Sequence, residues 1–162
     1  MPILLDNPSE LGSDLCSDSV GAIYKYGAPT IIVDMGTATK VLLVNQKGEF
    51  EGGVITPGFM LSQKALVDNA SLLTETRIKA PKKVVGKNTI DCMNSGALYG
   101  TKHMILGLVN DFEKELGVSC HKVLTGGNAI FFKDLLNDFI YDENLTLDGV
   151  YQILKRNPIR GK

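Results

Sequence analysis

The chain has 162 residues, of which 44% are hydrophobic and 22% are charged, and its formal net charge is −1. These values are ordinary for one soluble globular domain, and the charge offers no general attraction to nucleic acid or to a membrane surface. No apolar run is long enough to span a bilayer. The three cysteines lie outside any C-x-x-C pattern, and the first six residues lack the basic region of a signal peptide, so we expect a cytoplasmic protein with reduced thiols.

The first half of the chain predicts one helix followed by three strands. Apolar residues recur at helical spacing after Ser9, which is placed to cap the helix, and Gly27-Ala28-Pro29 ends it. Short apolar runs separated by turn residues then predict strands over 30–33, 41–44 and 49–55. Strands that follow one another through tight turns are typical of an antiparallel meander.

The second half predicts helices and one further strand. The longest helix is expected from about Cys92 to Leu116 and contains Gly96, Gly100 and Gly107. Because a glycine costs up to about 1 kcal/mol in a helix interior, something should pack closely here. The domain's own sheet is the simplest candidate, and a subunit or a ligand is the alternative. The other expected elements are helices over 59–67, 129–139 and 150–156 and a strand over 122–124.

This order of elements predicts an α/β domain in which a mixed sheet with an antiparallel meander is flanked by helices. Its character is ribonuclease-H-like. That unit is duplicated in the superfamily of acetate and sugar kinases, Hsp70 and actin, whose members close ATP between two such units. The order of elements described above occurs once in this sequence, so we expect one such unit.

Two glycine-containing turns are candidates for phosphate binding. In Asp34-Met35-Gly36-Thr37 an acid ends a buried strand, and glycine lets a phosphate approach the backbone closely. The threonine hydroxyl can donate to phosphate oxygens, and the aspartate can hold a cation beside them. Thr125-Gly126-Gly127 joins a strand to an expected helix N-terminus, which attracts anions. Taken singly, each pattern is more typical of an ordinary turn or connector.

Six ordered blocks resemble the motifs of type III pantothenate kinases and span almost the whole chain. Residues 10–14 resemble Glu-Leu-Gly-x-Asp, residues 34–39 resemble Asp-x-Gly-Thr-Ala-Thr, and residues 52–58 match Gly-Gly-x-Ile-x-Pro-Gly. The later blocks are 86–89 with 95–96 and 99–100, then 125–127, then 145–149. The resemblance implies ATP-dependent phosphorylation of pantothenate to 4'-phosphopantothenate, the first step of coenzyme A synthesis. It also implies Mg²⁺ and a monovalent cation, K⁺ or NH₄⁺.

The resemblance implies a role for each matching position. Asp14 aligns with the catalytic base that takes the proton from the pantothenate hydroxyl, and Asp34 aligns with the ligand of the monovalent cation. Thr89 aligns with a pantothenate contact that is contributed across a dimer interface, and its position also suits a helix cap. The other implied contacts are Gly12, Ser13 and Leu15 for pantothenate and Gly36, Thr37, Gly126 and Gly127 for ATP.

The chain also departs from the family's pattern. Leu15 stands where the family has an arginine, whose forked guanidinium suits the pantothenate carboxylate, and the loss would weaken binding by about 1.5–3 kcal/mol. Lys40 replaces a second threonine and is free to point to solvent or toward phosphate. Leu73-Thr74-Glu75 lacks the family's Leu-Pro. The Asp-x-Gly-Asn-Thr phosphate loop of the family's N-terminal domain does not occur in this sequence, so one wall of a two-domain ATP site is expected.

Three interpretations follow from this pattern. The chain is half of a kinase that works with another chain carrying the N-terminal half, or a non-catalytic binding or regulatory module, or an inactive fragment. We divide it into a helical segment (1–29), the ribonuclease-H-like domain (30–157) and a tail (158–162). A missing domain would leave an apolar patch uncovered, so we expect a homodimer or a complementing chain.

Overall fold

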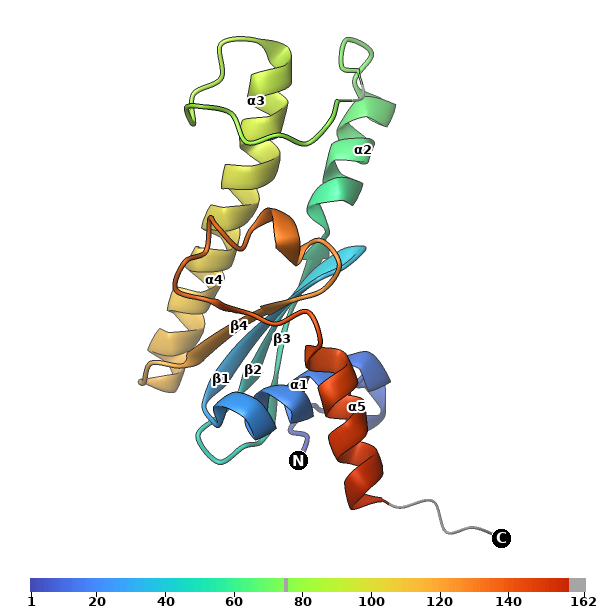
Figure 1. Ribbon diagram of the computed structural model, residues 1–162, viewed down its shortest axis with the longest axis vertical. Helices are drawn as coiled ribbons and strands as arrows, with labels where there is room; N and C mark the ends of the chain where they lie inside the picture. Colours follow the sequence, from blue (N-terminus) through green and yellow to red (C-terminus); the bar gives the residue numbers. More distant parts are fainter. Residues whose placement is uncertain (75, 158–162) are drawn as a thin grey trace, which may run out of the picture.

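The computed structural model describes residues 1–74 and 76–157, so Glu75 and the expected tail (158–162) lie outside the described residues. Its centre is a five-stranded sheet with the order β3-β2-β1-β4-β5 (Figure 1). The strands are β1 (Thr30–Met35), β2 (Ala38–Val44), β3 (Phe50–Pro57), β4 (His121–Thr125) and β5 (Ile140–Tyr141). The first three form the expected antiparallel meander, and β4 and β5 run parallel to β1. The prediction of a mixed, ribonuclease-H-like sheet is confirmed.

Helices cover both faces of this sheet. The helices α1 (Ser13–Tyr26) and α5 (Leu145–Arg156) lie together on one face, and α4 (Thr101–Leu116) lies on the other (Figure 1). Successive side chains of a strand point to opposite faces of the sheet, so β1 contributes side chains to two hydrophobic cores. Ile31 and Val33 join the core beneath α4, whereas Ile32 joins the core beneath α1 and α5. No helix in the described ranges is long and apolar enough to cross a membrane.

The pair α1 and α5 is held by close backbone contact and by an ion-pair network. A Cβ atom placed on Gly21 would lie 2.6 Å from the carbonyl oxygen of Leu145, so the two helices touch where they cross. At the end of α1, the Lys25 ammonium lies 2.6 Å from Asp142 and 2.7 Å from Asp148. Sequence segments more than a hundred residues apart therefore fix the position of α1.

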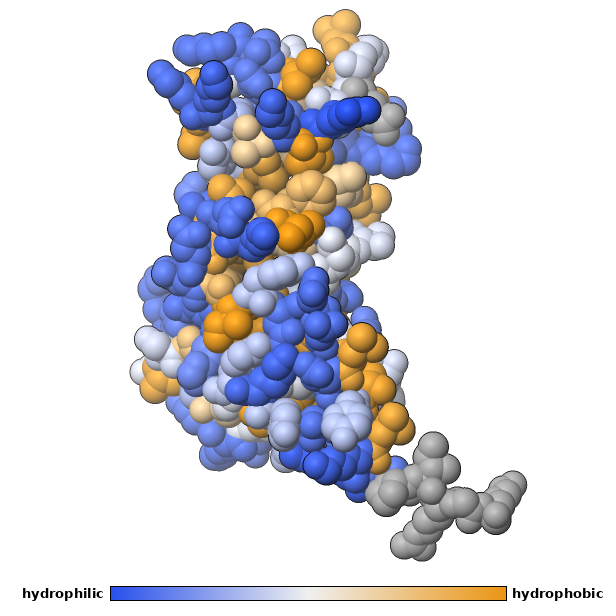
Figure 2. Space-filling model, viewed as in Figure 1, coloured by the Kyte–Doolittle hydropathy of each residue, from blue (hydrophilic) through white to orange (hydrophobic). Residues whose placement is uncertain are grey.

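Two helical arms extend from the sheet. One is α2 (Phe59–Asn69), and the other is α3 (Thr89–Ser95), which continues through a π-helical turn (Gly96–Gly100) into α4. The Gln63 side-chain amide donates to the Met93 carbonyl over 2.6 Å and links the arms. Figure 2 shows hydrophobic residues gathering on the surface between the arms.

Several predicted boundaries are wrong. Ser9 does not cap α1: Asn7 caps a short 3-10 helix (Pro8–Glu10), and α1 begins only at Ser13. The helix expected over 129–139 is a 3-10 turn (Ala129–Phe131) followed by further turns, because the chain buries Phe132, Leu136 and Phe139 while wrapping the sheet edge toward β5. Helix α5 begins five residues before the expected 150, since its interior glycine packs on α1 and does not end it.

The expected packing of the sheet against the glycines of the long helix is also wrong. A Cβ atom placed on Gly96, Gly100 or Gly107 would meet no atom of the described residues within 4 Å outside its chain neighbours and the nearby backbone of its own helix. The sheet is therefore not the reason for these glycines. The alternative, a subunit or ligand contact, stays a prediction.

Candidate functional site

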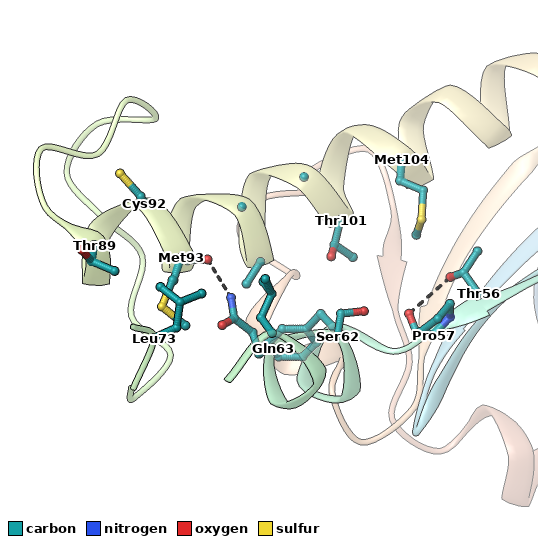
Figure 3. A pocket seen from close by; sticks show the side chains of 15 residues that line it. Thr56, Pro57, Ser62, Gln63, Leu73, Thr89, Cys92, Met93, Thr101 and Met104 are labelled. Atoms are coloured by element: carbon teal, nitrogen blue, oxygen red, sulfur yellow. Dashed lines mark hydrogen bonds between the residues drawn. The ribbon is translucent and has the colours of Figure 1, made fainter. Parts of the chain in front are cut away.

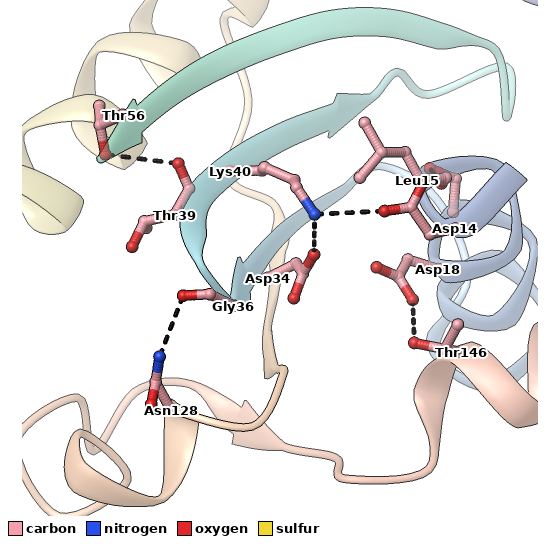
Figure 4. A network of polar contacts seen from close by, with 11 residues as sticks. Asp14, Leu15, Asp18, Asp34, Gly36, Thr39, Lys40, Thr56, Asn128 and Thr146 are labelled. Atoms are coloured by element: carbon pink, nitrogen blue, oxygen red, sulfur yellow. Dashed lines mark hydrogen bonds and ion pairs between the residues drawn. The ribbon is translucent and has the colours of Figure 1, made fainter. Parts of the chain in front are cut away.

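The centre of the candidate site is a cross-strand pair at the end of the first hairpin. Asp34 of β1 and Lys40 of β2 lie directly opposite each other in the antiparallel register. Their side chains point to the face that carries α1, and the Lys40 ammonium lies 2.7 Å from the Asp34 carboxylate (Figure 4). The Asp34 side chain is 13% exposed and that of Lys40 is 20% exposed, so this ion pair is largely shielded from water.

Asp14 reaches the same lysine from the first turn of α1. Its carboxylate lies 3.2 Å from the Lys40 nitrogen, and its side chain is 56% exposed. Partial burial raises the pKa of Asp14, but the hydrogen bond from the Leu15 amide and the Lys40 ammonium outweigh this effect and leave the pKa below 3.8. The residue is therefore an ionised, accessible proton acceptor at neutral pH.

Gly12 and Ser13 lead into this helix. A Cβ atom on Gly12 would lie 2.5 Å from an Asp14 carboxylate oxygen, so glycine leaves room for the carboxylate to fold back over the backbone. Ser13 is exposed beside it. Both residues therefore lie next to Asp14, and their contact with pantothenate stays a prediction.

Asp18 belongs to this site and was missed by the sequence reasoning. It is 1% exposed, and the Thr146 hydroxyl of α5 donates to its carboxylate over 2.5 Å. Burial raises the pKa of Asp18 to about 6, with the charges of Asp34 and Asp14 adding to this and Thr146 and Lys40 opposing it. The missed signal was the spacing, because residues 14 and 18 share one face of a helix.

The two glycine turns lie side by side at this end of the sheet. β1 and β4 are parallel neighbours that pair Asp34 with Thr125, so both turns follow adjacent strand ends. A Cβ atom on Gly126, whose φ is 93°, would lie 2.5 Å from Asp34 Oδ1, so only glycine fits there. Asn128, also missed, donates through its side-chain amide to the Gly36 carbonyl over 3.0 Å and ties the turns together (Figure 4).

The backbone of these turns is open to a ligand. Thr37 is exposed, and a Cβ atom on Gly127 would meet nothing within 4 Å. Exposed glycine turns of this kind allow a phosphate to approach the backbone, and the ATP contacts that the resemblance implies stay a prediction. Among residues 1–74 and 76–157, no three His, Cys, Asp or Glu side chains cluster closely enough to hold a metal ion.

The side chains of Leu15 and Thr89 take no part in the ion pairs around Asp14. Leu15 is partly buried against the hydrophobic cluster of α1, β2 and α5 and presents no polar group to a ligand. Thr89 is exposed at the start of α3, where Asn88 caps the helix by accepting from the Asp91 amide over 2.9 Å. Because α3 lies at the opposite end of the molecule from α1 (Figure 1), one chain does not bring Thr89 and Asp14 together.

Thr89 instead lies at one end of a groove between the two helical arms. Figure 3 shows its lining, and its volume is about 620 Å³. The walls are mainly apolar and include Leu66 and Leu73 on one side and Met93, Ala97 and Met104 on the other, with Gly96 and Gly100 between. The open faces of these two glycines therefore look into the groove.

Comparison with known proteins gives a consistent result. The family model for type III pantothenate kinases matches residues 1–111. The type III pantothenate kinase of Desulforapulum autotrophicum is 40% identical over 161 residues, which cover 98% of this chain and 61% of the relative. That of Rhodococcus jostii is 39% identical, with 99% of this chain and 61% of the relative covered. The chain thus spans about three fifths of the length of these curated relatives.

Solved structures support the fold. A Campylobacter jejuni protein described as a Baf family transcriptional activator superposes with a TM-score of 0.65 at 23% identity, covering 88% of this chain and 64% of that one. The Alp12 filament structure gives a TM-score of 0.52 at 14% identity, covering 86% of this chain and 52% of that one. At these sequence identities the similarity shows a shared fold and nothing further.

Proposed function

Because the chain belongs to the type III pantothenate kinase family, we propose that it forms one wall of an ATP-dependent pantothenate kinase site. The observation that carries this proposal is the junction at Lys40. Its ammonium lies 3.2 Å from Asp14 and 2.7 Å from Asp34, which brings the candidate base next to the turn that follows Asp34. A base beside a phosphate site is what phosphoryl transfer to a hydroxyl requires.

In the proposed reaction, the Asp14 carboxylate accepts the proton of the pantothenate hydroxyl as that oxygen attacks the γ-phosphorus. The bond between the γ-phosphorus and the β–γ bridging oxygen breaks, and its electrons leave with ADP. ATP with Mg²⁺ would supply the phosphoryl group. The backbone at Gly36, Thr37, Gly126 and Gly127 would hold phosphate oxygens, and Gly12 and Ser13 would lie against pantothenate.

A second chain is part of the proposal. Thr89 lies far from Asp14 within one chain, so a pantothenate contact by Thr89 needs a second copy. The groove beside it has apolar walls and open glycine faces, which supports a copy docking there as a homodimer. Since the relatives are longer, the other wall of the ATP site is proposed to come from a further segment or chain with the N-terminal half.

A coupled ADP-release assay with pantothenate, ATP, Mg²⁺ and K⁺ tests the proposal. Asp14→Asn keeps the size of the side chain and removes the proton acceptor, so pantothenate-dependent turnover should be abolished. Asp111→Asn is the matched control, because Asp111 is an exposed aspartate on α4 whose partner is Lys114. Turnover that survives Asp14→Asn at the wild-type rate would contradict the role of Asp14.

A non-catalytic binding module is the second candidate, and Leu15 is the observation that favours it. This side chain packs into an apolar cluster where the resemblance has an arginine for the substrate carboxylate. Such a module would bind a nucleotide or a partner and release no ADP, even when the N-terminal half of a relative is added. Calorimetric binding without turnover would favour the module over the kinase.

A further inference from the structure

Asp34 is the position at which the resemblance implies a monovalent cation, but its carboxylate is already enclosed. Oδ2 accepts from the Lys40 ammonium at 2.7 Å. On the other side, the backbone of Gly126 lies so close that a Cβ atom there would be 2.5 Å from Oδ1. The residues present therefore do not fit an inorganic cation, which would have to displace the ammonium.

The position of Lys40 is built into the fold. The hairpin register sets Lys40 directly opposite Asp34, and both side chains leave the sheet on the same face. A second carboxylate, Asp14, meets the ammonium from α1 at 3.2 Å, so the lysine is held from two elements (Figure 4). Pairing with two carboxylates and low exposure distinguish this lysine from a solvated surface side chain.

The Lys40 ammonium group and a free NH₄⁺ ion are chemically alike at this position. A lysine ammonium is a compact single positive charge with three donors, and NH₄⁺ is one of the two cations that the resemblance implies. Lys40 thus presents the same kind of charge, tethered to the chain. We propose that the Lys40 ammonium takes the place of the monovalent cation, so that this chain needs neither K⁺ nor NH₄⁺. The consequence for catalysis rests on the proposed kinase function.

Cation binding is measured first, because it does not depend on turnover. Thermal unfolding of wild type and Lys40→Thr is compared in KCl and in choline chloride at equal ionic strength. Threonine is the residue that the resemblance places here, and it frees Asp34. We expect equal Tm values for wild type and a K⁺-specific rise of about 2–4 °C for Lys40→Thr, as binding to the native state requires.

Two further variants serve this test, one as a substitute for Lys40→Thr and one as a control. Lys40→Met keeps the length of the side chain without its charge, and it replaces Lys40→Thr if the threonine variant does not fold. Lys64→Thr removes a lysine that is 69% exposed and should leave the response to K⁺ unchanged. A saturable K⁺-specific rise in the Tm of wild type would overturn the proposal. So would the absence of any K⁺ effect in both Lys40 variants, because Asp34 would then not be a cation position.

Turnover is the second readout. Where pantothenate-dependent turnover is found, its rate for wild type should be the same in KCl and in choline chloride. The Lys40→Thr variant should gain a requirement for K⁺. A wild-type requirement for K⁺ would overturn the inference while leaving the kinase proposal intact. Absence of turnover under all conditions would count against the proposed function, and the Tm comparison would still decide whether Lys40 replaces the cation.

Discussion

Gly149 of α5 lies against the backbone of Ser17 in α1. A Cβ atom on this glycine would lie 2.5 Å from the Ser17 carbonyl carbon and closer still to its oxygen. The contact sets the distance between the two helices, and α1 carries Asp14 and Asp18. The geometry of the candidate site therefore depends on a glycine in a different helix.

Gly149→Ala should destabilise the protein by about 2–3 kcal/mol, because the new methyl group forces the two helices apart. Gly107→Ala is the matched control: Gly107 is also inside a helix, but a Cβ atom there meets nothing. It should be neutral or more stable by up to about 1 kcal/mol. Urea denaturation measures both, and equal stabilities of the two variants would contradict the described contact.

The stability of the protein should depend on pH through Asp18. Its pKa is raised to about 6 by burial and by the charges of Asp34 and Asp14, against 3.8 in an unfolded chain. Between these values the native state holds the proton more tightly than the unfolded state, so this contribution to stability falls as pH rises from about 4 to about 6.

Asp18→Asn should remove this dependence. The amide oxygen can still accept from Thr146, and the variant should be more stable than wild type at pH 7 by up to about 3 kcal/mol. Chemical denaturation at pH 4, 5, 6 and 7 measures the difference. A difference that does not grow between pH 4 and pH 6 would contradict the raised pKa of Asp18.

Thr39 offers a test of an unsatisfied hydroxyl. The residue is 1% exposed, and its Oγ1 has no hydrogen-bond partner among the described residues. Thr39→Val should therefore stabilise the protein by about 1 kcal/mol. Thr30→Val is the control, because the buried Thr30 hydroxyl donates to the Gly27 carbonyl and its loss should destabilise by about 1 kcal/mol. Thermal unfolding distinguishes the two, and destabilisation by both would show that the Thr39 hydroxyl has a partner.

Leu15→Arg should strengthen the binding of pantothenate. The arginine would offer its guanidinium to the substrate carboxylate, a contact worth about 1.5–3 kcal/mol, or roughly 10- to 150-fold in affinity. Calorimetry with pantothenate measures the gain, and the analogue with an alcohol in place of the carboxylate should show none. An equal gain for both compounds would mean that the arginine does not contact the carboxylate.

The hairpin shows how far the sequence could predict this site. The apolar runs and turn residues placed β1 and β2, and the register of a tight hairpin centred on Thr37 pairs residues 34 and 40. The ion pair between Asp34 and Lys40 could therefore be predicted from the sequence pattern. Whether Lys40 points to solvent or toward phosphate was not, because the third partner, Asp14, comes from a helix whose position on the sheet is set by tertiary packing.

Other features depend on long-range contacts that local pattern does not encode. The spacing of Phe132, Leu136 and Phe139 is helical, yet the chain buries them in turns as it returns to the sheet edge. The partnership of Asp18 with Thr146 joins residues 128 positions apart. The fold was thus predictable from periodicity and motif order. The contact that α5 makes with Asp18 through Thr146, by contrast, was visible only in the structure.

The most direct test of the central claim is the formation of 4'-phosphopantothenate, followed by mass spectrometry. The chain is mixed with ATP, Mg²⁺, pantothenate and the N-terminal half of the Desulforapulum autotrophicum relative. The account predicts product with wild type and with Asp111→Asn, and none with Asp14→Asn. Product formation by Asp14→Asn, or none by a folded wild type in a stable complex with the added half, would contradict the claim that this chain supplies the catalytic wall.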